Sequence, residues 1–493
     1  MAKLFLFGIG GTGVRVIKSL TMLLAAGVDL NATELVPIIV DPHQGNHDLK
    51  RTIDLLNSYQ AIQSKLTPSN DGFFKTKVTT LQNLLSDRDR LGSTFSFQLK
   101  DVQNEQFREY IDHGSLDESN KALINLLFSE GNLETEMDIG FIGNPNIGSV
   151  VLNQFKDSDE FVHFASNFQQ GDRIFIVSSI FGGTGAAGFP TILKNLRNAQ
   201  PPLPNHDWIR NATVGAITLL PYFGVAPDPT SKIDKATFVA KAKAALSYYE
   251  RNISGNKTIN ALYYLGDNLT KDYPNDPGDQ GQRNDAHFIE LVAALSVIDF
   301  MNMDSSLLTT SNGRAVQPIY KEFGIREDQD ALNFTHLGDE TQQMIERLLS
   351  QYMLFTLYLS HYLNNAVNKQ PWTNRKQPKI DEAFLSTSFF QNHLTGFNHH
   401  FDLWILELRN NRRSFAPFNI PVDIRNLFEF INGVHPKSHW SPLRKDNFVL
   451  YDEALNKAER QVASPSAEQK FLRIFYEATE ALMREKFTTV DYD

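Results

Sequence analysis

The chain has 493 residues, of which 41% are hydrophobic and 21% charged, so it is a globular protein too long for one ordinary core. Its formal net charge of -10 disfavours nucleic acid and anionic membranes as partners, and the absence of cysteine excludes disulfides, zinc–thiolate sites and thiol catalysis. No apolar run approaches the roughly 20 residues of a membrane span, and the N-terminal residues are typical of a buried strand, so we expect a cytoplasmic protein without membrane contact.

The first 300 residues alternate apolar strand patterns with helical patterns, which is typical of an α/β fold with a parallel sheet. The predicted strands are 3–7, 35–40, 138–142, 173–178, 213–219 and 260–265, and the predicted helices are 13–26, 148–157, 187–198, 235–251 and 284–302. A helical insertion is expected at about 45–135. The sequence therefore predicts an α/β domain over residues 1–305.

The pattern changes after about residue 305. One candidate strand pair, "VQPIYKEFGI" and "ALNFTHL", is followed by successive helical patterns in which Phe, Leu and Tyr recur at spacings of three and four. Residues 306–493 are therefore predicted to form a mainly α-helical C-terminal domain.

Two glycine-rich clusters lie at strand-to-helix junctions. The first is "GIGGTG" (8–13), and the second is "FGGTGAAG" (181–188). Glycine allows positive φ values and close approach to the backbone, and the first N–H groups of a following helix are unpaired. Because the carboxyl ends of parallel strands share one edge, the clusters predict a two-part cradle for a phosphate chain. Neither is followed by the lysine of a Walker A loop, so this is not a P-loop NTPase.

The first cluster also satisfies the dinucleotide-binding pattern Gly-x-Gly-x-x-Gly through Gly8, Gly10 and Gly13, with Asp41 at the end of the next strand. A Rossmann-type enzyme that uses a dinucleotide or ATP, including an adenylating enzyme, is therefore one hypothesis. It leaves the second cluster without a role.

The second cluster resembles the signature loop of the tubulin/FtsZ superfamily, Gly-Gly-Gly-Thr-Gly-Ser/Thr-Gly, which holds the phosphates of GTP. Further motifs resemble the family in matching order: "GIGGTGVRVIKSL" and "IIVDPHQGN" are similar to its first two loops, and "GNPNIGS" (143–149) to its third. "ITLLPYF" (217–223) is similar to the turn behind the ribose, and "LGDNL" (265–269) to the loop that reads guanine. Residues 1–305 thus resemble a divergent bacterial tubulin-like GTP-binding domain.

The resemblance implies GTP or GDP as cofactor, with Mg²⁺ as its companion ion and no protein-held metal. Arg15 is expected to add charge-assisted contacts to phosphate, and Asp41 is the acid near the phosphates. The expected phosphate-binding residues are Gly10, Gly11, Thr12, Gly13, Asn144, Gly182, Gly183, Thr184, Gly185 and Ala186. The expected ribose- and base-binding residues are Asp267, Asn268, Asn284 and Phe288.

In this family an Asn-x-Asp-x-x-Asp/Glu loop of one subunit completes hydrolysis on the nucleotide of the next. Asn302 and Asp304 match the loop, but Leu307 replaces the second acid. Leucine can neither orient water nor accept its proton, so GTPase activity stays open.

Two further hypotheses follow from the resemblance. In the first, the protein self-associates head to tail into filaments or oligomers, with GTP hydrolysis at the subunit interface. In the second, it is a non-polymerising nucleotide switch or scaffold in a bacterial multi-protein system, and its helical C-terminal domain recruits a protein partner.

Overall fold

The computed structural model describes residues 2–43, 45–84, 94–97, 99–137, 141, 144–225, 235–267, 272–273, 284–323, 330–411, 413–419, 424–437 and 447–487. The predicted strand at 138–142 lies almost wholly outside these residues. None of the described helices combines the length and the hydropathy that crossing a lipid bilayer requires.

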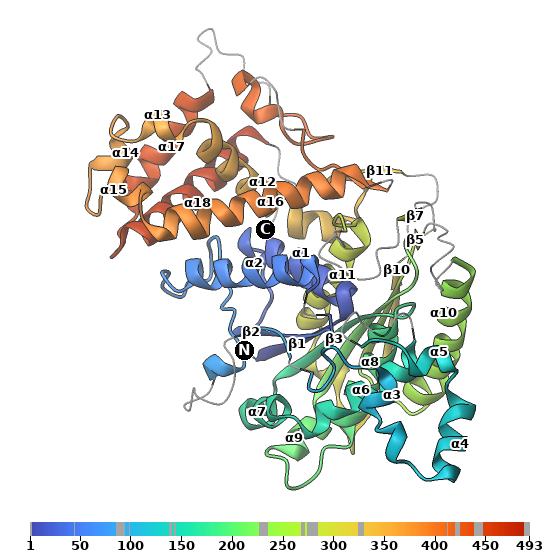
Figure 1. Ribbon diagram of the computed structural model, residues 1–493. Helices are drawn as coiled ribbons and strands as arrows, with labels where there is room; N and C mark the ends of the chain where they lie inside the picture. The colour runs from blue at the N-terminus through green and yellow to red at the C-terminus, as the bar shows by residue number, and fades with distance from the viewer. Residues whose placement is uncertain are drawn as a thin grey trace.

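A six-stranded parallel sheet forms the centre of the N-terminal part (Figure 1), with strand order β10-β6-β4-β3-β1-β2. The strands are β1 (Lys3–Ile9), β2 (Glu34–Val40), β3 (Arg173–Ser179), β4 (Thr213–Leu219), β6 (Ala261–Leu265) and β10 (Ile319–Phe323). The strands are largely apolar, and every residue of the inner strand β3 and of the edge strand β2 is buried, as expected for strands covered on both faces. Gly8 of β1 pairs with Ile39 and Val177, so the junctions after β1 and β3 share one edge.

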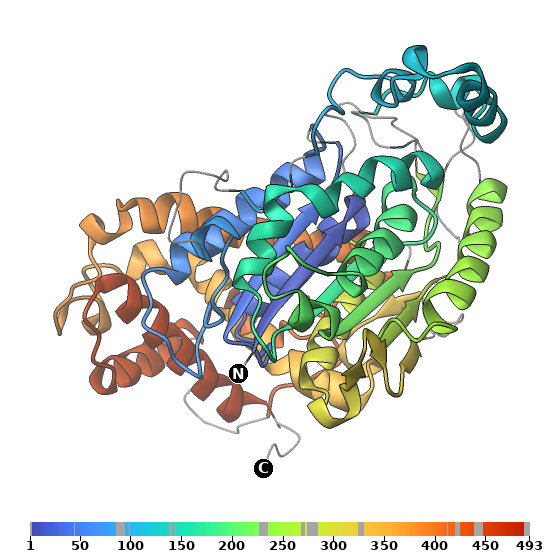
Figure 2. The same cartoon turned by 90° about the horizontal axis from the view of Figure 1, so that it is seen from below.

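Helices cover both faces of this sheet. One face carries α1 (Gly10–Ala25), α2 (His47–Gln63) and α11 (Phe288–Asn302). The opposite face carries α6 (Pro145–Leu152), α7 (Asp159–Asn167) and α8 (Gly183–Arg197), with α9 (His206–Arg210) and α10 (Lys235–Tyr249) beside them (Figure 2).

The C-terminal part is a helical layer that packs on α1 and α2. Its main helices are α12 (Asp339–His361), α16 (Thr395–Asn410), α17 (Asn447–Gln461) and α18 (Ala467–Lys486), and its short ones are α13 (Leu363–Ala366), α14 (Pro371–Asn374) and α15 (Glu382–Leu385). Aromatic contacts join the two parts: Tyr59 of α2 packs on Phe397, and Trp404 Nε1 of α16 donates to Ser19 Oγ of α1 at 3.2 Å. The predicted fold class, a parallel α/β sheet followed by a mainly helical region, is confirmed.

The segment between β2 and α6, where a helical insertion is predicted, contains several short helices among its described residues. Besides α2 it contains α3 (Phe107–Tyr110), α4 (Glu118–Leu127) and α5 (Glu130–Leu133), which extend beyond the carboxyl edge of the sheet in Figure 2.

The predicted strand pair after residue 305 is wrong. Its first member, β10, is an edge strand that pairs in parallel with β6, and the planes of the Phe323 and Tyr263 rings are parallel with their centroids 6.3 Å apart. Its second member, β11 (Ala331–Leu332), instead pairs with β12 (Ser414–Phe415). β10 suits an edge because all its residues are half-buried or exposed, whereas the inner strands are mostly buried. The remaining short strands are β5 (Gly224–Val225), β7 (Asp272–Tyr273), β8 (Thr310–Ser311) and β9 (Arg314–Ala315).

Candidate functional site

The two glycine loops touch each other at the carboxyl edge of the sheet. Gly10 has φ +68°, and a Cβ atom there would lie 3.4 Å from Thr184 Cβ and 3.7 Å from the backbone nitrogen of Gly185. A positive φ favours glycine, so the first loop takes a shape that other residues adopt only with strain. Clusters 170 residues apart in the sequence thus form one continuous surface.

Two glycines of these loops are required by packing alone. A Cβ at Gly13 would lie 2.6 Å from the carbonyl carbon of Gly8, and one at Gly185 would lie 2.6 Å from the carbonyl oxygen of Ser179. Gly11, Gly182 and Thr184 are instead half-buried and form the accessible part of the loops. The space for a ligand therefore lies at these three residues.

Backbone N–H groups open onto this surface from two helices. α1 begins at Gly10 and α8 at Gly183, and neither of the preceding residues, Ile9 and Gly182, supplies a side-chain cap. Uncapped first turns carry unpaired donors and the positive end of the helix dipole, which together bind anions. The arrangement is suited to a phosphate chain.

The third predicted loop approaches the second one. Gly148 of α6 packs so closely on α8 that a Cβ there would lie 2.8 Å from Ala187 Cβ and 3.0 Å from the Gly183 carbonyl oxygen. Asn144 caps its own helix: its Oδ1 accepts from the backbone nitrogens of Asn146 at 3.1 Å and Ile147 at 3.4 Å.

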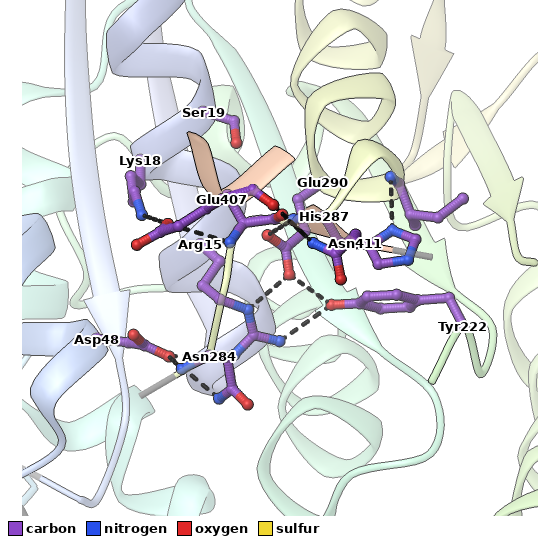
Figure 3. A network of polar contacts seen from close by, with 12 residues as sticks. Arg15, Lys18, Ser19, Asp48, Tyr222, Asn284, His287, Glu290, Glu407 and Asn411 are labelled. Carbon is purple, nitrogen blue, oxygen red and sulfur yellow. Dashed lines mark hydrogen bonds and ion pairs between the residues drawn. The ribbon is translucent and has the colours of Figure 1, made fainter. Parts of the chain in front are cut away.

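Arg15 lies beside Gly11 of the first loop, where a Cβ atom would be 3.5 Å from its Nη1, and protein groups bind its guanidinium. Its Nε donates to Glu290 Oε1 at 2.6 Å, and its Nη2 donates to the Tyr222 hydroxyl at 3.0 Å (Figure 3). Its Nη1 is 3.6 Å from Asp48 Oδ2. Burial would lower the pKa of Arg15, but Tyr222, Glu290 and Asp48 outweigh burial and hold this pKa above its usual value. The guanidinium is therefore a fixed charge inside the protein.

The residues predicted for ribose and base contact other parts of the protein. Asn284 donates to Asp48 Oδ2 of α2 from its backbone nitrogen at 3.4 Å and its Nδ2 at 3.2 Å. Asp267 accepts two bonds from Arg413, at 2.5 and 2.8 Å, and the Phe288 ring stacks on Phe415 at 5.2 Å. Asn268 lies outside the described residues. The base end of the predicted site is thus bonded to α2 and to the C-terminal region.

Glu407 of α16 joins three segments at this end of the site, and sequence reasoning missed it. Its carboxylate accepts from Lys18 Nζ at 2.6 Å (Figure 3). It also accepts from Arg51 Nη2 at 2.6 Å and from the backbone nitrogen of Ala286 at 3.1 Å. An acid in an amphipathic helical pattern gives no sequence signal for such a role.

Two titratable groups near the loops have pKa values shifted by burial. Burial raises the pKa of Asp41 to about 7, against the opposing effects of the hydrogen bond from the His43 backbone nitrogen and of the Arg15 charge. Burial lowers the pKa of His287 to about 4, so this ring is neutral at pH 7, and its Nδ1 accepts from the backbone nitrogen of Ile289. Within the described residues no group of three or more His, Asp or Glu side chains is arranged to hold a metal ion.

Asn302 and Asp304 lie at the opposite edge of the sheet from the glycine loops. They follow the end of α11, which is held by Arg173 at the start of β3: the Arg173 guanidinium donates to the carbonyl oxygens of Phe300 and Met303 at 2.6 and 2.9 Å. Asp304 is exposed, and its Oδ1 accepts from the Ser306 backbone nitrogen at 2.8 Å. This bond, with the nearby Arg173, holds the pKa of Asp304 below its usual value. One chain therefore does not bring this carboxylate to its own glycine loops.

No family model matches the sequence. No curated protein matches it either. Among solved structures, the chain is similar to CetZ from Methanosaeta thermophila, with 13% identity, a TM-score of 0.24, and coverage of 54% of this chain and 46% of that one. It is also similar to CetZ2 from Haloferax volcanii, described as a GTPγS-bound protofilament, with 13% identity, a TM-score of 0.28, and coverage of 62% and 61%.

Both of these proteins belong to the tubulin/FtsZ family, which is the family that the sequence motifs resemble. The chain spans between about half and three fifths of their lengths. At these TM-scores the similarity carries no argument about the site.

Proposed function

We propose that this protein is a tubulin-like nucleotide-binding protein that holds GTP or GDP between residues 8–13, 143–149 and 181–187. The observation that supports this most is the contact between Gly10 and Thr184, which joins two uncapped helix N-termini into one anion-binding surface. A P-loop lysine is absent from both loops, so the backbone donors of α1 and α8 would hold the phosphates. Mg²⁺ would accompany them, because this ion is usually held in proteins by substrate phosphates and water.

We also propose that copies of the protein associate head to tail. Asp304 is exposed at one edge of the sheet and the glycine loops are at the other, so only a second copy could bring the acid to the phosphates. An interface between unlike faces either propagates or closes into a ring. Leu307, which is 57% exposed, stands where the family has a second acid. Because leucine cannot accept a proton, hydrolysis would depend on Asp304 alone and would be slow.

A second candidate function is a nucleotide-controlled switch without polymerisation. Glu407 and Arg413 bond the C-terminal helical region to residues at the base end of the site, so a nucleotide that shifts Ala286 or Asp267 would also shift the helical layer. A partner protein bound to this helical layer would then respond to the presence of the nucleotide. The Rossmann-type alternative is disfavoured because Asp41, its ribose-binding acid, is only 4% exposed.

The test is to identify the nucleotide that the purified protein releases on denaturation. We would compare the native chain with Gly11→Trp, whose side chain would fill the space beside the first loop next to Arg15 and Asn46, and with Gly114→Trp, an exposed position with open space around it. GDP or GTP in the native protein and in Gly114→Trp, with none in Gly11→Trp, is the expected result. An adenine dinucleotide, or equal nucleotide in all three proteins, contradicts the proposal.

Self-association is tested separately by sedimentation with and without added GTP. Pelleting that requires GTP supports the head-to-tail assembly. Nucleotide binding without any change in sedimentation supports the switch instead.

A further inference from the structure

A second pocket lies beside the glycine loops, on the side of α8 that faces away from α1. It has a volume of about 420 Å³ and is lined by residues of α6, α8 and α10 and of the segments that flank them. This volume is within the range of small-molecule pockets in proteins.

The pocket is built by regularly spaced side chains of these helices. α8 contributes Gly182, Ala186, Pro190 and Lys194, each four residues after the last, which places them on one helix face. α10 contributes a matching face that includes Lys241, Ala245, Tyr248 and Tyr249, and α6 adds Asn146 and Asn153. Tyr248 is 51% exposed at the rim, whereas Tyr249 is buried.

A proline in α8 fixes the floor of this pocket. Pro190 has no N–H group, so the Ala186 carbonyl oxygen lacks its helical hydrogen bond. The Tyr249 hydroxyl donates to that oxygen at 3.2 Å, and the Tyr249 ring packs edge-on against Phe189 at 5.2 Å. This bond connects the C-terminal end of α10 to α8. Lys241, Ala244 and Ala245 of α10 line the pocket wall.

The charge of the lining favours an anion. It contains Lys194 and Lys241 and no Asp or Glu among the described residues, in a chain whose net charge is -10. Lys194 forms no ion pair with any described residue. Its ammonium group is thus available beside an apolar wall of Ile180, Phe181 and Pro190.

The pocket adjoins the second and third loops of the proposed nucleotide site and lies away from the first loop. No residue of the first loop, of α1 or of α11 lines it. It shares Phe181, Gly182 and Ala186 with the second loop, and Pro145, Asn146 and Ser149 with the third loop.

We propose that this pocket binds a small amphipathic organic anion, a carboxylate, sulfonate or phosphate with an aromatic or aliphatic body. The body would contact the aromatic and proline side chains, and the anionic group would pair with Lys194. Burial of the body supplies affinity, and Lys194 selects the charge.

The probe for this proposal is 8-anilinonaphthalene-1-sulfonate, titrated by fluorescence against the full-length protein. N-phenyl-1-naphthylamine has the same aromatic body without the sulfonate and measures the contribution of the charge. We expect saturable binding of the anion that is about tenfold tighter than binding of the neutral probe.

The variants locate the binding. Lys194→Gln should weaken binding of the anion about three- to tenfold and leave the neutral probe unchanged. Lys243→Gln is the matched control, because this exposed lysine of α10 does not line the pocket. Ala245→Trp should abolish binding of both probes by filling the pocket, while Gly11→Trp should leave it intact.

Several outcomes overturn the proposal. They are equal affinity for the two probes, equal loss in Lys194→Gln and Lys243→Gln, or undiminished binding in a folded Ala245→Trp. Loss of binding in Gly11→Trp would assign the probe to the glycine loops instead. Lys194 is exposed, so its variant tests the idea even where Ala245→Trp fails to fold.

Discussion

Replacing Glu407 by glutamine tests whether one carboxylate holds the C-terminal helices to the glycine-loop helices. The change keeps the shape of the side chain and removes its charge. Lys18 and Arg51 then lose a partner at 2.6 Å while their side chains remain only 7% and 10% exposed. A buried cation without its counter-charge costs several kcal/mol, because it has lost its water as well as its partner.

The expected loss of unfolding free energy depends on which acids remain near Lys18 and Arg51 after the change. Breaking a buried ion pair by removing one member typically costs about 3–5 kcal/mol. Asp48 stays 3.9 Å from Arg51 and compensates part of its charge, whereas Lys18 keeps no such acid within ion-pair distance among the described residues. We therefore expect Glu407→Gln to lower the free energy of unfolding by about 3 kcal/mol at pH 7, the lower end of that range.

The effect should depend on pH in a defined direction. Burial would raise the pKa of Glu407, but Lys18 and Arg51 outweigh burial and hold this pKa below its usual value. The stabilisation is therefore fully present above the pKa of an unfolded glutamate, about 4.3, and is lost as the pH falls through the folded value. The difference between the two proteins should shrink below about pH 4.

The assay is urea unfolding followed by circular dichroism and by tryptophan fluorescence, to which Trp404 contributes from a buried position on the same helix. Glu477→Gln is the matched control, since Glu477 pairs with Arg473 on the surface and both side chains are more than one third exposed. That control should cost less than about 0.5 kcal/mol. If Glu407→Gln costs no more than the control at pH 7, the reasoning is refuted.

Three further results are expected. Asp41→Asn should stabilise the protein by about 2–4 kcal/mol at pH 8 and by less at pH 5. An unfolded aspartate ionises near pH 4 but Asp41 only near pH 7, so the stability of the wild-type protein falls as the pH rises between these values. An equal gain at both pH values in urea titrations would contradict this. Gly13→Ala should destabilise the protein by about 2 kcal/mol or more and empty the nucleotide site. Gly396→Ala, in a helix with open space around it, should stabilise the protein by about 0.5–1 kcal/mol. Thermal unfolding together with nucleotide analysis distinguishes the two variants. Asp304→Asn should leave nucleotide content unchanged but slow GTP turnover about 100-fold at high protein concentration, and unchanged turnover would remove Asp304 from the proposed interface.

The parallel sheet was predictable because each of its strands has a recognisable local sequence pattern. "LVPIIV" and "RIFIVS" are short apolar runs bounded by turn residues, and such runs form strands buried on both faces. The meeting of the two glycine loops followed from the same prediction, since parallel strands end at one edge. β10 was placed wrongly because partner choice is set by distant residues such as Tyr263, not by the strand's own pattern.

The polar network around Arg15 could not be predicted in the same way. A cation just after a glycine loop suggests a phosphate contact, but the acid that it meets, Glu290, is 275 residues away. Glu407 is 389 residues from Lys18 and lies in an ordinary amphipathic pattern. Neither pair has a local signal, because long-range charge pairing depends on how helices pack after they form.

The same separation bears on the order in which the protein is completed during its synthesis. Lys18 and Arg51 leave the ribosome long before Glu407, which follows them by 389 and 356 residues. A nascent chain that lacks this carboxylate cannot bury either cation at low cost, so α1 and α2 should stay loosely packed on the growing sheet. The helix that starts in the first glycine loop would then take its final position only after α16 has been made, and the nucleotide surface would be among the last parts of the molecule to mature.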